Sequence, residues 1–561
     1  MSRCLTILLA LSAVLAGCLN REEKMHADVI YTGGDIWTGE PNAPRARAVA
    51  VAQGRILMVG TSEQALEFRA PKTRVVDLHG RFMMPGFVDS HTHFLEAGES
   101  LLTVPVRGVR DEAELARVVG ERVRRSSKGA WITGRGWDHE SWPSAQLPTR
   151  RLIDKVTPDN PVLIKRLDGH MALANSMALK LAGITASTAD PAGGQILRDA
   201  SGEATGILRD EAIELVNRVI PEPSAADKLK ALEAAFAEAR RLGVTTAVAI
   251  GEWQDVGLFK NAAGQGKATA RIHAVITLPL QERAMADLHD VVEDDFLHWR
   301  AVKGYMDGSL GAGTAWLFEP YNDQPGSVGL PAAMWFPEGN MKRMIKEADA
   351  TGLQVMVHAI GDRANVELLK IYEEVAAENG ARDRRFRVEH AQHLTNQAIN
   401  DFARLGVIAS MQPAHLIDDG CWAEKRLGPA RLKGSYALRS LIDKGVLVAF
   451  GTDWPVASLN PLLGVYAAVT RRTADGKNPD GWIPEQKISV EEALTCYTRN
   501  SAQAIFAENR VGTLKPGKLA DMVILSASPF KVDPEAIKDI SALETIVAGK
   551  TVYTRGESKL P

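Results

Sequence analysis

Between about residue 224 and residue 450, apolar runs alternate with stretches whose apolar positions recur at helical spacing. Strands that alternate with helices in this way are typical of a parallel sheet. The expected strands cover 244–249, 271–278, 301–306, 353–358, 386–389, 407–411 and 446–450, and the expected helices cover 224–242, 338–351, 366–379, 397–405 and 437–444. With a first strand that starts near Phe87, this repetition predicts an α/β fold built on a (β/α)8 TIM barrel. A doubly wound sheet is the alternative, but no Gly-rich phosphate loop follows a strand.

The stretch between the first expected strand, which ends at His93, and the next, which starts at Val244, is too long for one connection. It contains apolar runs of its own at 130–134 and 162–166, and a turn typical of a hairpin at Ser201-Gly202. The pattern therefore predicts an insertion domain over about 105–223, placed over the mouth of the barrel.

Short apolar segments with glycine turns fill residues 27–84, and the same style returns over 505–561. We expect these two segments to form one discontinuous small β-sandwich domain beside the barrel, which then occupies 85–504. The C-terminal strands are expected to complete the N-terminal sheet.

The first residues have a different character. A positive charge at Arg3 precedes an apolar run that is too short to span a bilayer and that ends in Leu15-Ala16-Gly17-Cys18. This order resembles a bacterial lipoprotein signal peptide over 1–18, with the lipid on Cys18. We expect an exported, membrane-anchored protein that faces the periplasm, and Leu19 fits outer-membrane sorting in a Gram-negative host. A plain secretory signal with a chance cysteine, or a short buried helix, is the alternative.

Composition narrows the function classes. Lys and Arg number 66 against 69 Asp and Glu, for a net charge of −3, and no basic stripe is present that would follow a phosphate backbone. Outside the signal only Cys421 and Cys496 remain, which is too few for a disulfide framework or a Cys-rich metal site. We therefore expect a small-molecule substrate and no nucleic acid, with a homodimer left open.

The sharpest local signal is His91-Thr92-His93 at the end of the first barrel strand. Residues two apart on a strand face the same side, so both imidazoles can point at one metal ion. Two histidines alone are more often structural than functional. Recurrence at equivalent positions strengthens the pair, because His358, His390 and Asp453 each stand where another barrel strand ends, which is the active-site face of such barrels.

Lys303 lies inside an apolar strand. The ordinary interpretation is a lysine whose ammonium group reaches the rim and stays in water. A buried ammonium would be costly unless its charge were paired or removed.

With these ligand candidates in place, the chain resembles the amidohydrolase superfamily, and more closely its YtcJ-like branch, which includes N-substituted formamide deformylases. The resemblance covers nearly all of the chain after the signal. The matching motifs are at 85–94, 134–138, 168–170 with Asn175, 307–311, 358–363, 389–392, 451–455 and 517–521.

This resemblance implies two divalent metal ions, usually Zn2+, with a single ion as the alternative. It implies that His91, His93 and Asp453 bind the more buried ion and that His358 and His390 bind the second. It also implies that Lys303 is carboxylated and bridges both ions, which would replace a buried cation by an oxygen ligand.

The expected mechanism uses a metal-activated hydroxide as nucleophile. Asp453 would act as general base toward it and then as general acid toward the leaving amine. His170 is a second catalytic candidate, since it could donate a hydrogen bond to the substrate carbonyl, and its alternative role is to fix the insertion to the barrel. Further candidates for the substrate pocket are Trp137, Asp138, Asp307, Trp316 and Trp454, with Trp142 less favoured, although capping, ligand orientation or core packing would explain each of them.

The sequence therefore predicts a hydrolase of non-peptide C–N bonds, such as those of N-formyl or N-acyl amines. A lactonase, a phosphoesterase or a cyclic amidase would use the same metal site. A metal-binding lipoprotein without turnover is the alternative of another class, but a chain that had lost activity would more often have lost one of the ligands.

Overall fold

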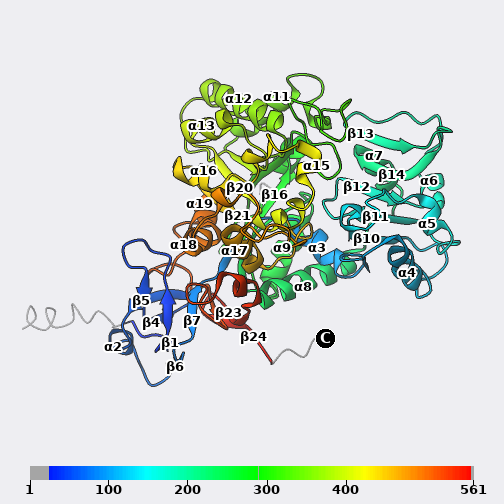
Figure 1. Cartoon of the computed structure of the whole chain (residues 1–561). Coiled ribbons are helices and arrows are strands. Elements are labelled where there is room, and N and C mark those ends of the chain that lie inside the picture. The colour runs from blue at the N-terminus through cyan, green and yellow to red at the C-terminus, as the bar shows by residue number, and fades with distance from the viewer. Residues whose placement is uncertain (1–24, 288–289, 557–561) are drawn as a thin grey trace, which may run out of the picture.

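The computed structural model describes residues 25–287 and 290–556 (Figure 1). The expected signal peptide, including Cys18, lies outside the described residues. Among the helices that the structure describes, none is both long and apolar enough to cross a membrane. Cys421 and Cys496 are both free thiols, so they do not pair with each other.

The centre of the molecule is a parallel eight-stranded sheet that curls into a nearly closed barrel (Figure 1). The isolated parallel bridge between Thr92 and Trp454 brings the first strand next to the segment that follows the last one. Every residue of the second and fifth strands is buried, as expected for a parallel sheet covered on both faces. The strands in barrel order are β8 (Phe87–Thr92), β15 (Val244–Ile250), β16 (Arg271–Thr277), β17 (Leu297–Tyr305), β18 (Gln354–Ala359), β19 (Arg387–His390), β20 (Ile408–Met411) and β21 (Val448–Phe450). The predicted TIM barrel is confirmed.

Helices surround this sheet, and the five for which a range was predicted match it closely. The largest difference is the start of the helix predicted over 366–379, which begins at Asp362. Its first turn is polar, and Asn365 donates hydrogen bonds back to the carbonyls of Ala359 and Gly361, so apolar periodicity could not mark it. The helices are α3 (Phe94–Ser100), α8 (Ala225–Arg241), α9 (Asp255–Gly264), α10 (Gln281–Asp287), α11 (Asn340–Ala350), α12 (Asp362–Asn379), α13 (Asn396–Leu405), α14 (Leu416–Asp419), α15 (Ala423–Leu427), α16 (Leu438–Asp443), α17 (Pro461–Thr470), α18 (Val490–Thr495) and α19 (Ser501–Ala504).

The insertion after the first barrel strand forms its own sheet beside the barrel (Figure 1). Its strands, in spatial order, are β13 (Gly194–Arg198), β14 (Ala204–Asp210), β12 (Met171–Ala174), β11 (Val162–Arg166), β10 (Ile132–Trp137) and β9 (Val104–Pro105). Its helices are α4 (Glu112–Val123), α5 (Arg150–Asp154), α6 (Ser176–Leu181) and α7 (Glu211–Asn217). The hairpin predicted at Ser201-Gly202 joins β13 to β14.

The N- and C-terminal segments form two sheets rather than one extended N-terminal sheet. The first has the order β5 (Arg55–Gly60), β4 (Ala48–Ala52), β1 (Val29–Thr32) and β6 (Arg74–Asp77), and α2 (Ser62–Leu66) packs against it. The second has the order β24 (Lys550–Thr554), β23 (Ala542–Val547), β22 (Met522–Leu525), β7 (Phe82–Pro85), β2 (Asp35–Trp37) and β3 (Arg45–Ala46). The C-terminal strands thus complete a sheet of N-terminal strands, as expected, while the first sheet is built from N-terminal strands alone. Strand β22 pairs with β7, which runs directly into barrel strand β8.

Candidate active site

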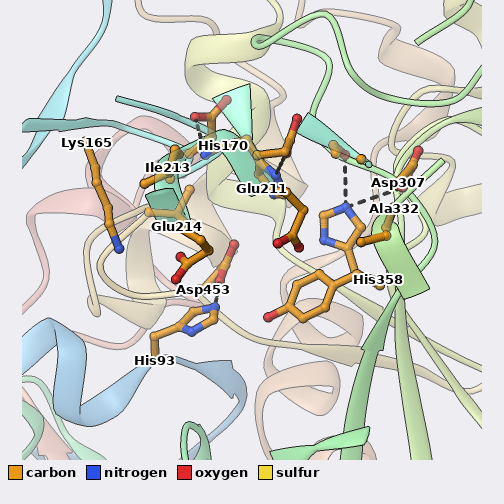
Figure 2. A pocket seen from close by; sticks show the side chains of 18 of the residues that line it. His93, Lys165, His170, Glu211, Ile213, Glu214, Asp307, Ala332, His358 and Asp453 are labelled. Carbon is orange, nitrogen blue, oxygen red and sulfur yellow. Dashed lines mark hydrogen bonds and ion pairs between the residues drawn. The ribbon is translucent and has the colours of Figure 1, made fainter. Parts of the chain in front are cut away.

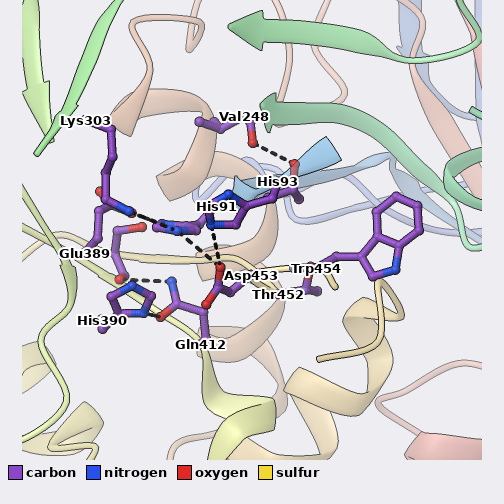
Figure 3. Close-up of polar contacts among 12 residues, drawn as sticks. His91, His93, Val248, Lys303, Glu389, His390, Gln412, Thr452, Asp453 and Trp454 are labelled. Carbon is purple, nitrogen blue, oxygen red and sulfur yellow. Dashed lines mark hydrogen bonds and ion pairs between the residues drawn. The ribbon is translucent and has the colours of Figure 1, made fainter. Parts of the chain in front are cut away.

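The end of strand β8 and the turn after β21 bring His91, His93 and Asp453 together (Figure 3). Asp453 Oδ1 lies 3.4 Å from His91 Nε2 and 3.3 Å from His93 Nε2. The backbone N–H of Asp453 donates to the carbonyl of His91 at 2.7 Å, which ties the turn to the strand. Within the described residues, Asp453 Oδ1 is buried and accepts no hydrogen bond. A buried carboxylate oxygen that faces two imidazole nitrogens matches the donor set of a divalent metal ion.

His358 and His390 lie next to this group. The ring centroid of His390 is 4.9 Å from that of His91 and 4.5 Å from that of His358. His390 comes from the end of β19 and His358 from β18, so three different barrel strands supply the histidines. The structure therefore brings together all four histidines that the sequence placed at strand ends.

Three of these histidines have one ring nitrogen bound to a group that can accept a hydrogen bond. His91 Nδ1 lies 2.5 Å from Glu389 Oε2, His390 Nδ1 lies 2.8 Å from Gln412 Oε1, and His358 Nε2 lies 2.9 Å from the Gly308 carbonyl. Because these oxygens accept, the bound nitrogen carries the proton and the other nitrogen keeps its lone pair. Histidine ligands of metals are oriented by partners of this kind.

The protonation of the cluster suits metal binding as well. Burial lowers the pKa of His93 and His358, and lowers that of His390 well below its usual value, so these imidazoles stay neutral. Burial opposes the ionisation of Asp453, but His91 and His93 nevertheless hold its pKa well below the usual value. The site thus combines neutral nitrogen donors with an anionic oxygen, which is the form in which these side chains bind metals.

Lys303, on strand β17, is 1% exposed and lies within this cluster. Its Nζ is 3.4 Å from His91 Nε2 (Figure 3). It also lies 4.5 Å from the centre of the Tyr305 ring. Burial lowers the pKa of Lys303 to about 8. The lysine does not reach the rim, so the ordinary interpretation of an ammonium group in water does not apply.

Glu389 was missed by sequence reasoning. Burial opposes its ionisation, but Arg387 and His91 hold its pKa at about 2. Arg387 donates to both of its oxygens, at 2.8 and 3.1 Å. The sequence did offer a signal for this role. Arg387 and Glu389 stand two residues apart on one strand, directly before the candidate ligand His390, so both face the barrel interior.

A cavity of about 260 Å3 opens beside the cluster, and the insertion domain covers it (Figure 2). His93, Lys303, His358, His390 and Asp453 line its barrel side. His170 lines the opposite side, with its ring centroid 5.2 Å from that of His358. A smaller cavity of about 50 Å3 continues past His170 and Asp453 toward Leu310, Ile360 and Trp422. The candidate site therefore lies between the barrel and the insertion domain.

The model of the amidohydrolase family matches residues 74–553. This chain belongs to the amidohydrolase family.

Relatives of this amidohydrolase match it over nearly all their length. It is 40% identical to the protein LONG AFTER FAR-RED 3 of Arabidopsis thaliana over 94% of this chain and 92% of that protein. It is 34% identical to the putative amidohydrolase YtcJ of Bacillus subtilis, over 94% and 99%. It is 26% identical to the N-substituted formamide deformylase of Arthrobacter pascens, over 94% and 98%. Among solved structures, a metal-dependent hydrolase of Pyrococcus horikoshii superposes with a TM-score of 0.73 and 28% identity, over 90% of this chain and 99% of that one.

The two acidic candidates of this amidohydrolase, Asp307 and Asp138, lie outside the ligand cluster. Asp307 lines the cavity and accepts hydrogen bonds from the backbone N–H groups of Trp316, Ile360 and Gly361, and it lies 3.4 Å from His358 Nε2. It therefore holds the loop around His358. Asp138 caps a short helical turn and forms an ion pair with Arg166, away from the cavity wall.

The four tryptophans considered for an aromatic pocket are packed elsewhere in the amidohydrolase. Trp137 and Trp142 belong to the core of the insertion domain, and their indole N–H groups donate to the carbonyls of Ile164 and Val109. Trp316 packs against Trp335, and Trp454 packs edge-on against Phe94. None of these tryptophans lines either cavity next to the ligands. Their burial between packed elements corrects the expected pocket role.

Proposed function

We propose that this amidohydrolase hydrolyses a non-peptide C–N bond, of the kind found in N-formyl and N-acyl amines. The observation that carries the proposal is the set of three histidines, each held by a hydrogen bond from one ring nitrogen so that the other nitrogen is available beside Asp453 and Lys303. The likeness to a formamide deformylase over nearly the whole chain supports the choice of bond.

Two Zn2+ ions are the proposed cofactors. His91, His93 and Asp453 would hold one of them, which fits the buried, unsatisfied oxygen of Asp453. His358 and His390 would hold the other. Metal ions bound there supply a water of lowered pKa and a positive charge that polarises a carbonyl.

Lys303 would complete the ligand set as a carbamate. Its lowered pKa increases the fraction of neutral amine, and this is the form whose nitrogen attacks the carbon of CO2. An N–C bond forms, the nitrogen loses a proton, and the side chain becomes an anion with two oxygens. This change would remove the cost of burying an ammonium group beside His91.

Asp453 would carry the proton in the reaction. Its Oδ1 faces the two imidazoles, which leaves Oδ2 to take a proton from the attacking water. The same oxygen would then return the proton to the leaving amine, so that a neutral amine departs. His170, on the opposite side of the cavity, would contact the oxygen of the substrate carbonyl.

The proposal is tested by metal analysis of the purified protein together with a hydrolysis panel of N-formyl amines, N-acyl amines, lactones and phosphotriesters. We expect at least one metal per chain, loss of metal in His91→Ala, and turnover of the amides. His79→Ala, at an exposed histidine far from the cluster, is the matched control and should behave as wild type. Metal content that is unchanged in His91→Ala would refute the site. Turnover confined to lactones or phosphotriesters would refute the bond.

We also propose that the mature protein is exported and held at a membrane by a lipid on Cys18, on the basis of the order of charged, apolar and Leu-Ala-Gly-Cys segments. Cys18→Ser should move the protein from the membrane fraction to the soluble fraction. Wild-type protein that is soluble and carries an unmodified Cys18 by mass spectrometry would refute the anchor.

A further inference from the structure

Asp210 and His170 form a close pair at the edge of the insertion domain that faces the barrel. His170 stands directly before strand β12 and Asp210 ends strand β14, and the backbone N–H of Asp210 donates to the His170 carbonyl at 3.1 Å. Their side chains also meet, since His170 Nδ1 lies 2.6 Å from Asp210 Oδ1. Two neighbouring strands of the insertion domain therefore present the pair as a unit.

We propose that Asp210 is a positioning residue of the active site, which holds the ring of His170 so that Nε2 faces the substrate cavity. This inference rests on the proposed hydrolysis at the same site. The carboxylate of Asp210 accepts from His170 Nδ1, so Nε2 is the ring nitrogen left to meet the substrate. The ring stands against that of His358 and lines the cavity that Asp453 lines from the barrel.

The backbone of Asp210 argues that its side chain is needed where it is. Its φ of +46° and ψ of −123° lie in a region that is sparsely populated by residues other than glycine. Such a conformation is strained for an aspartate, and glycine would adopt it with less strain. A strained aspartate is difficult to explain by stability alone, because Asp210 Oδ2 is also buried without a hydrogen-bond partner.

The barrel loop under the pair is shaped to receive it. A Cβ added to Gly308 would lie 2.9 Å from Asp210 Oδ1, so the carboxylate packs where a larger residue would stand. The carbonyl of the same Gly308 orients His358. Beside it, Ser309 donates to Asp168 at 2.6 Å, and Asp168 accepts from the backbone N–H of His170. The pair is therefore fixed both to its own domain and to the loop that orients a barrel histidine.

The barrel supplies the ligand cluster, and the insertion domain supplies a carboxylate–histidine pair that completes the cavity from above. His170 would contact the substrate, and Asp210 would act through His170 without touching it.

The test is a double-mutant cycle on kcat/KM with an N-formyl amine substrate. Asp210→Gly removes the carboxylate and suits the backbone conformation, so we expect kcat/KM to fall by about 10- to 100-fold with no loss of melting temperature or bound metal. Asp210→Asn keeps an oxygen that can accept from Nδ1, and it should recover most of that loss. In a His170→Ala background, Asp210→Gly should cause no further loss, because its effect passes through the missing ring.

Asp199→Asn, in the exposed turn between β13 and β14, is the matched carboxylate control and should keep wild-type activity. Wild-type kcat/KM in Asp210→Gly, or losses that add in the double variant, would overturn the role of Asp210. The failure of the proposed function would look different, because wild type would then not turn over the amides, and the same cycle would be run on the lactone or phosphotriester that it does hydrolyse. If Asp210→Gly folds poorly, Asp210→Ser, whose side chain is too short to reach Nδ1, takes its place in the cycle with the same expected losses.

Discussion

Glu389 lies directly beneath His91, with its Oε2 2.5 Å from the Nδ1 of the ring, and both side chains are completely buried. The two residues are separated by most of the barrel along the chain, and the closure of the sheet brings them together. Arg387 neutralises the same carboxylate from the other side. The ligand His91 is therefore oriented by a charged pair inside the barrel rather than by the loops around the mouth.

Removing the charge of Glu389 should weaken metal binding. In Glu389→Gln the amide still accepts from His91, but the imidazole loses an anionic partner and becomes a poorer donor. We expect metal affinity to fall by about 10- to 100-fold. Competition with a chelator of known affinity measures this change. Glu374→Gln, at an exposed partner of Lys342, should leave the affinity unchanged, and equal affinities in both variants would contradict the role of Glu389.

Asp453→Asn should separate binding from turnover. The amide oxygen can still face His91 and His93, so most of the metal should remain bound. It cannot take a proton from water or give one to an amine, and general acid–base catalysis of this kind contributes about 10²- to 10⁴-fold. We expect kcat to fall by that order while metal content changes little. A near-normal kcat would show that another group moves the proton.

The ligand set could be predicted from the sequence because two independent rules agree on it. Strand ends were marked by apolar runs before His358, His390 and Asp453, and histidine and aspartate at that edge of a barrel are suited to metals. The TIM barrel itself could be predicted because its strands, even short ones such as β20 and β21, are apolar and alternate with amphipathic helices.

The supports of the ligands could not be predicted, because they depend on which side chains meet across the fold. Glu389 and Asp210 are ordinary carboxylates in the sequence, and their roles arise from contacts with His91 and His170 that only folding creates. The tryptophans failed for the opposite reason. Aromatic residue type suggested a pocket, but Trp137 and Trp454 face packed cores, and sequence spacing does not tell the two environments apart.

Acid should destabilise the fold through His273, which lies 7% exposed on strand β16 with Nε2 unsatisfied. Burial, with His298 and Arg387, lowers the pKa of His273 to about 3. The unfolded chain takes up the proton near its usual pKa of about 6.5, so the folded state is favoured fully above that pH and loses stability as the pH falls from about 6.5 toward 3.

Urea unfolding at pH 7.5 and at pH 5 measures this effect. We expect His273→Gln to lose less free energy of unfolding than wild type between the two pH values. In wild type, the unprotonated His273 of the folded state costs about 1.4 kcal/mol of stability for each pH unit below about 6.5. The comparison uses the change within each protein, so a constant cost of the substitution cancels. Parallel changes in wild type and variant would show that His273 is not the group that responds.

The ion pair of Arg271 and Asp521 should hold the C-terminal segment to the base of the barrel. Arg271 Nε and Nη2 donate to the two carboxylate oxygens of Asp521, at 2.6 and 2.8 Å. Both residues are 4% exposed. Arg271→Met leaves the carboxylate buried with only the N–H of Ala548 as partner. Loss of one member of a buried pair costs about 3–5 kcal/mol, because the remaining charge is not compensated.

The same reasoning predicts a rescue that distinguishes charge from packing. Replacing both residues, as in Arg271→Met with Asp521→Leu, removes the unpaired charge, and we expect it to recover at least half of the lost free energy of unfolding. Arg241→Gln, which breaks a solvent-exposed pair with Glu238, should cost less than about 1 kcal/mol. Urea unfolding of wild type, the two single variants, the double variant and Arg241→Gln measures these differences. A double variant as unstable as the sum of its single variants would mean that the side chains matter for their shape and not for their charges, and that the C-terminal strands are held by the pairing of β22 with β7 alone.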